Sequence, residues 1–182
     1  MRPVLALLVV ASLAWGAPAP AEAPPAGKPD PLRTLFPDAD RFDAADVILT
    51  DEMARRLDEL ARSRIPERMV TFYTAQRANE VLGYGVLQSH VVRTKRETLL
   101  VAFEADGRIR RIVVLSFLEP PEYKPSERWL GQFTGKTATD RLAVGDDLAP
   151  ISGSTLSARG VAEQSRWLLQ ALRMAREARR VP

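Results

Sequence analysis

The stretch that decides the fold is residues 98–118, TLLVAFEADGRIRRIVVLSFL. Two apolar, β-rich runs, residues 98–103 and 109–118, flank the tetrapeptide Ala105-Asp106-Gly107-Arg108. An Asp-Gly pair between such runs is the strongest short-range signal for a β-hairpin. We therefore predict two antiparallel strands joined by this turn, with alternate residues of 109–115 facing the core.

The rest of the chain adds strands and helices around this hairpin. Two further β-rich runs, residues 69–75 and 81–92, precede it, and the four runs together predict an antiparallel sheet of about four strands. Apolar spacing predicts an N-terminal helix over residues 50–63, a short helix over 125–133 and a C-terminal helix over 157–179. Strands followed by helices in this order predict an α+β fold.

Composition limits the classes of function. The 182 residues suit one domain. Lysine and arginine number 26 against 23 acidic residues, and because the two signs are interspersed we expect no nucleic-acid partner. The chain has no cysteine and one histidine, which excludes a disulfide framework, thiol chemistry and multi-histidine metal sites. We expect no bound metal.

The N-terminus has the pattern of a secretory signal. Arg2 precedes an apolar run over residues 4–15 and then small residues, and the run is shorter than the ~20 residues of a membrane span. We predict a signal peptide over residues 1–21, an Ala/Pro-rich tether and lead-in over 22–45, and the folded domain over 46–182. An uncleaved N-terminal anchor is the alternative. The expected location is the periplasm or another extracytoplasmic site, with membrane association.

A second informative stretch lies before the last predicted helix. Residues 146–157 read DDLAPISGSTLS. Gly153 allows a backbone turn that is closed to residues with a Cβ, and Ser154, Thr155 and Ser157 can each cap the helix that follows. A helix N-terminus favours a phosphate group. The simpler interpretation is a loop followed by a helix cap.

This stretch resembles the flavinylation motif of the FMN-binding domain family, which includes the G subunit of the Rnf electron-transfer complex and the C subunit of the sodium-translocating NADH:quinone reductase. The family pattern is an acidic residue, an apolar pair and Ser/Thr-Gly-Ala-Thr before a helix. Ser152, Gly153 and Thr155 match it, whereas Ser154 stands where alanine is usual.

The resemblance covers about residues 69–175. It includes the hairpin and the segment WLGQFTGK at 129–136, similar to a recurring aromatic-x-x-Gln-Phe-x-Gly-Lys element. One departure is Pro120-Pro121-Glu122-Tyr123, which replaces a glycine-rich turn.

The resemblance implies a cofactor, its site and its partners. FMN would be esterified through its phosphate to Thr155 by a separate flavin transferase, which reads an acidic residue at Asp147 or Asp146. The other implied cofactor-binding residues surround the phosphate, cover the flavin ring or balance its charge: Ser152, Gly153, Ser154, Leu156, Trp129 and Lys136.

The implied function is that of an exported electron carrier, which relays electrons between extracytoplasmic or membrane redox partners. An exported binding or structural domain of the same fold, without a cofactor, is the alternative. A flavin enzyme acting on a small substrate is a third interpretation. It ranks last, because the sequence points to no acid–base pair and no substrate pocket.

Overall fold

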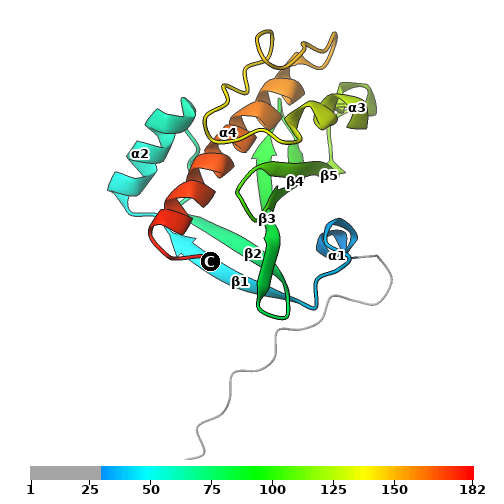
Figure 1. The fold of residues 1–182 in the computed structure, drawn as a ribbon. Helices are drawn as coiled ribbons and strands as arrows, with labels where there is room; N and C mark the ends of the chain where they lie inside the picture. The colour runs from blue at the N-terminus through cyan, green and yellow to red at the C-terminus, as the bar shows by residue number, and fades with distance from the viewer. Residues whose placement is uncertain (1–29) are drawn as a thin grey trace, which may run out of the picture.

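An antiparallel sheet of five strands runs through residues 30–182, the part of the chain that the computed structural model describes (Figure 1). The strands neighbour one another in chain order, and each adjacent pair is antiparallel. Their bounds are β1 Arg41–Ile48, β2 Met69–Arg77, β3 Glu80–Val91, β4 Arg96–Glu104 and β5 Ile109–Phe117. The expected signal peptide, residues 1–21, and the first part of the tether lie outside the described residues.

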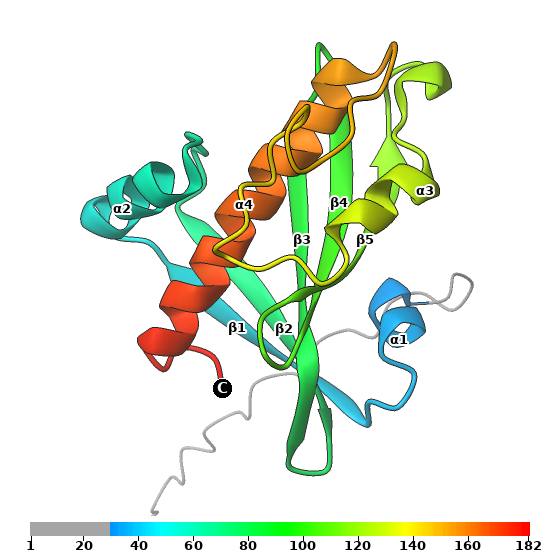
Figure 2. The same ribbon diagram turned by 45° about the horizontal axis from the view of Figure 1, so that its top comes forward.

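Within residues 30–182, four α-helices and two short 3₁₀ turns pack around the sheet. The longest helix, α4, crosses one face, with α2 beside it (Figure 2). The helices are α1 Pro31–Leu35, α2 Asp51–Ala61, α3 Glu127–Leu130 and α4 Thr155–Glu177, and the 3₁₀ turns are η1 Pro121–Tyr123 and η2 Gly131–Phe133.

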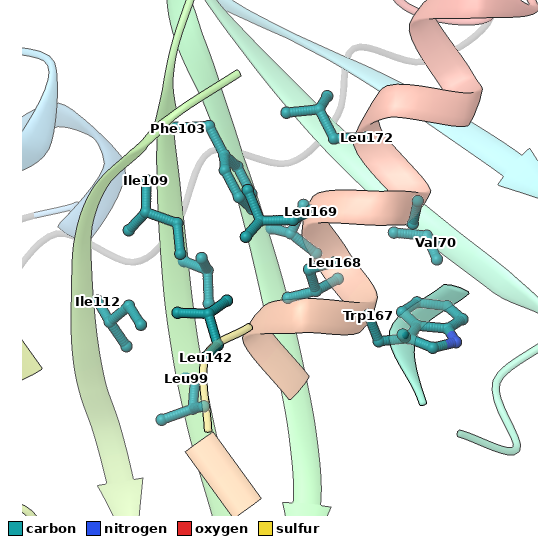
Figure 3. Close-up of a cluster of buried hydrophobic side chains, with 14 of the residues drawn as sticks. Val70, Leu99, Phe103, Ile109, Ile112, Leu142, Trp167, Leu168, Leu169 and Leu172 are labelled. Carbon is teal, nitrogen blue, oxygen red and sulfur yellow. The ribbon is translucent and has the colours of Figure 1, made fainter. Parts of the chain in front are cut away.

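The core lies between α4 and the sheet. In Figure 3, Leu168, Leu169 and Leu172 of α4 lie over Phe103 and Ile109 of the β4–β5 hairpin. All five side chains are at most 2% exposed. Their burial removes apolar surface from water, which is the main stabilising contribution to a domain of this size.

The opposite face of the sheet receives α1. Gly83 and Gly85 of β3 leave space on this face, because a Cβ on Gly83 would collide with the Phe103 carbonyl oxygen of β4 and stand 2.6 Å from the Phe36 ring, and one on Gly85 would collide with Leu32. The lead-in segment is therefore packed on the sheet from Leu32 onward.

The predicted hairpin is confirmed. The β4–β5 turn is closed by two hydrogen bonds, from the Glu104 N–H to the Arg108 carbonyl oxygen and from the Gly107 N–H to the Glu104 carbonyl oxygen. Gly107 takes a φ of 90°, in the left-handed region that favours glycine. Buried and exposed side chains do not alternate strictly along β5, however. The register shifts next to Arg110, so that Ile109 and Ile112, three positions apart, are both buried.

The α+β class is confirmed, but the sheet has five strands rather than about four. The additional strand is β1, RFDAADVI, whose aspartates and alanines are uncommon in strands. It is an edge strand held along its length by β2. Other differences are α1, which had not been predicted, the division of the predicted 125–133 helix into α3 and η2, and the start of α4 at Thr155 rather than 157.

Candidate functional site

The residues of the 152–155 motif form the turn that leads into α4. Gly153 has a φ of 80°, so a residue with a Cβ would be strained there. Ser152 and Gly153 are exposed, as is Thr155, the first residue of α4. The Thr155 hydroxyl is 3.5 Å from the carbonyl oxygen of Ile151. An exposed hydroxyl therefore stands at the N-terminus of a 23-residue helix.

The N-terminus of α4 differs from those of the shorter α-helices. Side chains of Asp30, Thr50 and Ser126 accept a hydrogen bond from the first turns of α1, α2 and α3. Ser154 holds the corresponding position before α4, but its side chain accepts none, contrary to the capping role considered from sequence. Since the first-turn N–H groups of a helix have no acceptor within it, those of α4 remain available to an anion.

The Ser154 side chain is instead turned inward. It is 4% exposed, and its hydroxyl donates to the carbonyl oxygen of Glu122, at 3.2 Å. Glu122 belongs to η1, the segment that replaces the family's glycine-rich turn. The two departures from the family pattern therefore contact each other, and together they fix the motif to η1.

Trp129 and Gln132 hold the loop before the motif. The Trp129 indole N–H donates to the carbonyl oxygen of Ala149 at 2.6 Å, and the Gln132 side-chain oxygen accepts from the Ala149 N–H at 2.8 Å. Trp129 is 6% exposed, and its ring meets Phe133 edge-on at 5.2 Å. The structure thus places Trp129 in the core as an anchor for this loop.

Lys136 and Asp147 form a separate polar cluster. The Lys136 amine is 3.1 Å from the Asp147 carboxylate and 3.6 Å from that of Asp140. Asp147 also accepts from the N–H groups of Leu142 and Ala143, at 3.1 and 2.7 Å. Burial alone would raise the pKa of Asp147, but the donors from Ala143, Lys136 and Leu142 outweigh it and hold that pKa below its usual range.

This cluster lies beside the middle of α4. Arg166 of α4 donates to the carbonyl oxygen of Leu142 at 2.8 Å, and the N–H of Leu142 is bound by Asp147. Arg166 stands about three turns after Thr155, or roughly 16 Å along the helix. The structure therefore gathers Ser152, Gly153, Ser154, Thr155 and Leu156 at the start of α4, whereas Lys136 and Asp147 bond to each other and to residues 140–143.

Two residues outside the motif make structural contacts for which no role had been predicted. Gln132 was noted only as part of the 129–136 element, and the role of its side chain depends on a loop 17 positions later. Glu119 is 9% exposed and accepts from the N–H groups of Thr94 and Lys95, at 2.7 and 2.8 Å. These bonds lower the pKa of Glu119 and close the β3–β4 turn.

Two further observations concern residues 30–182. No helix in this range has both the length and the apolar character that crossing a membrane requires. Its acidic residues and its histidine form no group of three that could hold a metal ion.

Comparison with known proteins gives a partial match. No protein-family model matches the chain. The G subunit of the Na⁺-translocating ferredoxin:NAD⁺ oxidoreductase complex of Acetobacterium woodii is 31% identical over an aligned length of 107 residues, which covers 53% of this chain and 52% of that protein. The chain thus spans about half the length of the curated relative it matches. The similarity supports the resemblance at the level of a G-type subunit, and does not extend to flavinylation itself.

Proposed function

We propose that this chain is an electron-transfer protein that carries FMN on Thr155 through a phosphoester bond. The observation that carries the proposal is the N-terminus of α4, where an exposed threonine hydroxyl adjoins first-turn N–H groups that the Ser154 side chain leaves uncapped. The similarity to a subunit of an oxidoreductase complex supports an electron-transfer role.

The residues around Thr155 fit a phosphate group. The first-turn N–H groups and the positive end of the helix dipole stabilise its charge. Gly153 sets the turn that exposes these groups, and Ser152 and Leu156 are exposed on either side. In the attachment step, the Thr155 oxygen would bond to the flavin-side phosphorus of a flavin dinucleotide. The pyrophosphate bond would break, and a nucleoside monophosphate and the hydroxyl proton would leave. The bound flavin would supply reversible electron transfer.

Residues that do not adjoin Thr155 have an indirect role in this proposal. Trp129 holds Ala149, and Asp147 holds residues 142–143 with help from Lys136. Both ends of the 142–149 loop before the motif are therefore fixed. In this view, Asp147 shapes the segment that a flavin transferase has to recognise.

The cellular setting is part of the same proposal. The leader pattern supports export by the signal peptide at residues 1–21. The resemblance supports flavinylation of the 46–182 domain outside the cytoplasm and redox partners at a membrane. Mass spectrometry of a periplasmic fraction tests export. A mature chain starting at Ala17 or Glu22 supports it, and an intact soluble chain recovered solely from the cytoplasm contradicts it.

Co-expression with a flavin transferase tests the attachment. The wild-type band should fluoresce in a denaturing gel and gain the mass of one FMN less a water. Thr155→Val should abolish the label with the fold intact, while Thr139→Val, at another exposed threonine, should keep it.

A second comparison tests the acceptor itself. Ser154→Ala restores the residue usual in the family and should still be labelled, because the buried Ser154 hydroxyl is not exposed to a transferase. A label mapped to Ser154 would contradict the assignment of Thr155. Complete absence of label, with a transferase that modifies a known acceptor, would favour the cofactor-free domain.

A further inference from the structure

We propose that the groove between β5 and α3 binds an extended, acidic peptide segment of a partner protein, which adds a sixth strand to the sheet. This inference does not depend on the flavin, and it concerns a surface other than the motif at the start of α4.

The groove lies along the last strand of the sheet. β5 pairs with β4 on one side and is the edge strand on the other. Between residues 110–114 of β5 and residues 124–134 is a cavity of about 520 Å³. Peptides that extend a sheet bind in this type of groove, between an edge strand and a helix.

The chain itself begins a sixth strand on this edge and then leaves it. The Ile109 N–H donates to the carbonyl oxygen of Lys136 at 2.8 Å, and the Gly135 N–H donates to that of Ile109 at 2.7 Å. Gly135 has a φ of 80°. The residues that precede it form α3 and η2 instead of continuing along β5. Within residues 30–182, no backbone hydrogen bond from outside the sheet reaches 111–114. A guest strand would continue the ladder that Gly135 and Lys136 start.

The lining of the groove is cationic. Arg110, Arg111, Lys124 and Arg128 line it, against one acidic residue, Glu127. Arg110 and Arg111 already have acidic neighbours, Glu104 at 3.1 Å and Glu127 at 3.6 Å. Lys124 and Arg128 are exposed and form no ion pair in the described part of the chain. This imbalance favours a guest segment with carboxylate side chains.

The groove also has apolar walls. Val113 and Val114 of β5 are half-buried, and Pro125 and Leu130 opposite are buried. Successive side chains of a strand point to opposite sides, so a segment with alternating acidic and aliphatic residues would match both the cations and the apolar walls. Trp129 of α3 does not line the groove. Its indole N–H donates to the carbonyl oxygen of Ala149, in the loop before the motif, so α3 separates the groove from the motif.

The test uses the complete mature chain and three labelled hexapeptides. The first peptide alternates glutamate with valine, and the second alternates lysine with valine. The third peptide has the same sequence as the first, but every second backbone nitrogen is methylated. Fluorescence anisotropy should show binding of the first peptide, and at least tenfold weaker binding of the other two. Methylation removes N–H donors and keeps the side chains, so it separates strand addition from charge attraction.

Backbone NMR locates the contact. Amide signals of residues 111–114 should shift and gain protection from hydrogen exchange when the glutamate peptide is added. Lys124→Glu and Arg128→Glu should each weaken binding at least tenfold, whereas Arg55→Glu, at an exposed cation on α2, should leave it unchanged.

Four results would overturn the proposal. They are equal binding of the methylated peptide, absence of binding at millimolar peptide, amide shifts at β1 instead of β5, and self-association of the chain that protects residues 111–114 without peptide. Binding to phosphatidylserine vesicles that Lys124→Glu abolishes, without any peptide binding, would assign the cations to a membrane instead.

Discussion

Replacement of Asp147 by asparagine should destabilise the domain far more than the same change at Asp146. The Asp147 carboxylate accepts from Leu142, Ala143 and Lys136. Asparagine keeps one acceptor oxygen and turns an NH₂ group toward the remaining donors. At about 1.5–3 kcal/mol for a hydrogen bond to a charged group, reduced for partial exposure, the expected cost is about 2–3 kcal/mol.

The neighbouring acid provides the matched control. Asp146 pairs with Arg141, but their side chains are 46% and 65% exposed, and such surface pairs contribute about 0–1 kcal/mol. For a domain of this size, a loss of 1 kcal/mol lowers the melting temperature by about 2–4 °C. Thermal unfolding followed by circular dichroism at pH 7 should therefore show a drop of roughly 4–12 °C for Asp147→Asn and a much smaller one for Asp146→Asn.

The dependence on pH checks the same reasoning. The folded-state pKa of Asp147 is below its unfolded value, so the stability that its charge contributes is present above about pH 4 and is lost as the pH falls through the folded value. The difference between wild type and Asp147→Asn should shrink in acid. Equal melting temperatures for the two asparagine variants at pH 7 would refute the structural role of Asp147.

Three other changes test separate parts of the fold. Gly160→Ala places a Cβ 2.6 Å from Nε2 of His90, which should lower the free energy of unfolding by about 1–3 kcal/mol, and His90→Ala in the same chain should recover part of that loss in a urea titration. Glu119→Gln should speed hydrogen exchange at the Thr94 amide at pH 7, because the carboxylate that accepts its hydrogen bond is gone; unchanged exchange would contradict this role. Gly153→Ala should cost about 1–2 kcal/mol in the same titration through backbone strain alone, since beyond the adjoining residues no atom lies within 4 Å of the new Cβ.

The parts of the fold that could be predicted are those encoded by neighbouring residues. The β4–β5 hairpin follows from Asp106-Gly107, and α2 follows from an apolar stripe after Thr50, which does cap it. β1 could not be predicted, since its sequence has low strand propensity and its pairing depends on β2, which follows about 20 residues later.

The candidate site likewise has some features that the local sequence indicates and others that depend on distant residues. The exposed turn at Gly153 and the start of a helix at Thr155 are local, and the sequence indicates both. The inward turn of Ser154 depends on a carbonyl group 32 positions earlier, and the engagement of Lys136 depends on a carboxylate 11 positions later. Neither partner can be identified from the motif itself, so the free N–H groups of α4 became apparent only in the folded chain.

Gly160 brings the backbone of α4 close to His90 of β3, because a Cβ at this position would stand 2.6 Å from Nε2 of His90. A larger residue at position 160 would have to push α4 away from the imidazole ring or displace that ring. The spacing between α4 and β3 is therefore set at a position that lies about 7 Å along the helix axis from Thr155, the proposed attachment residue.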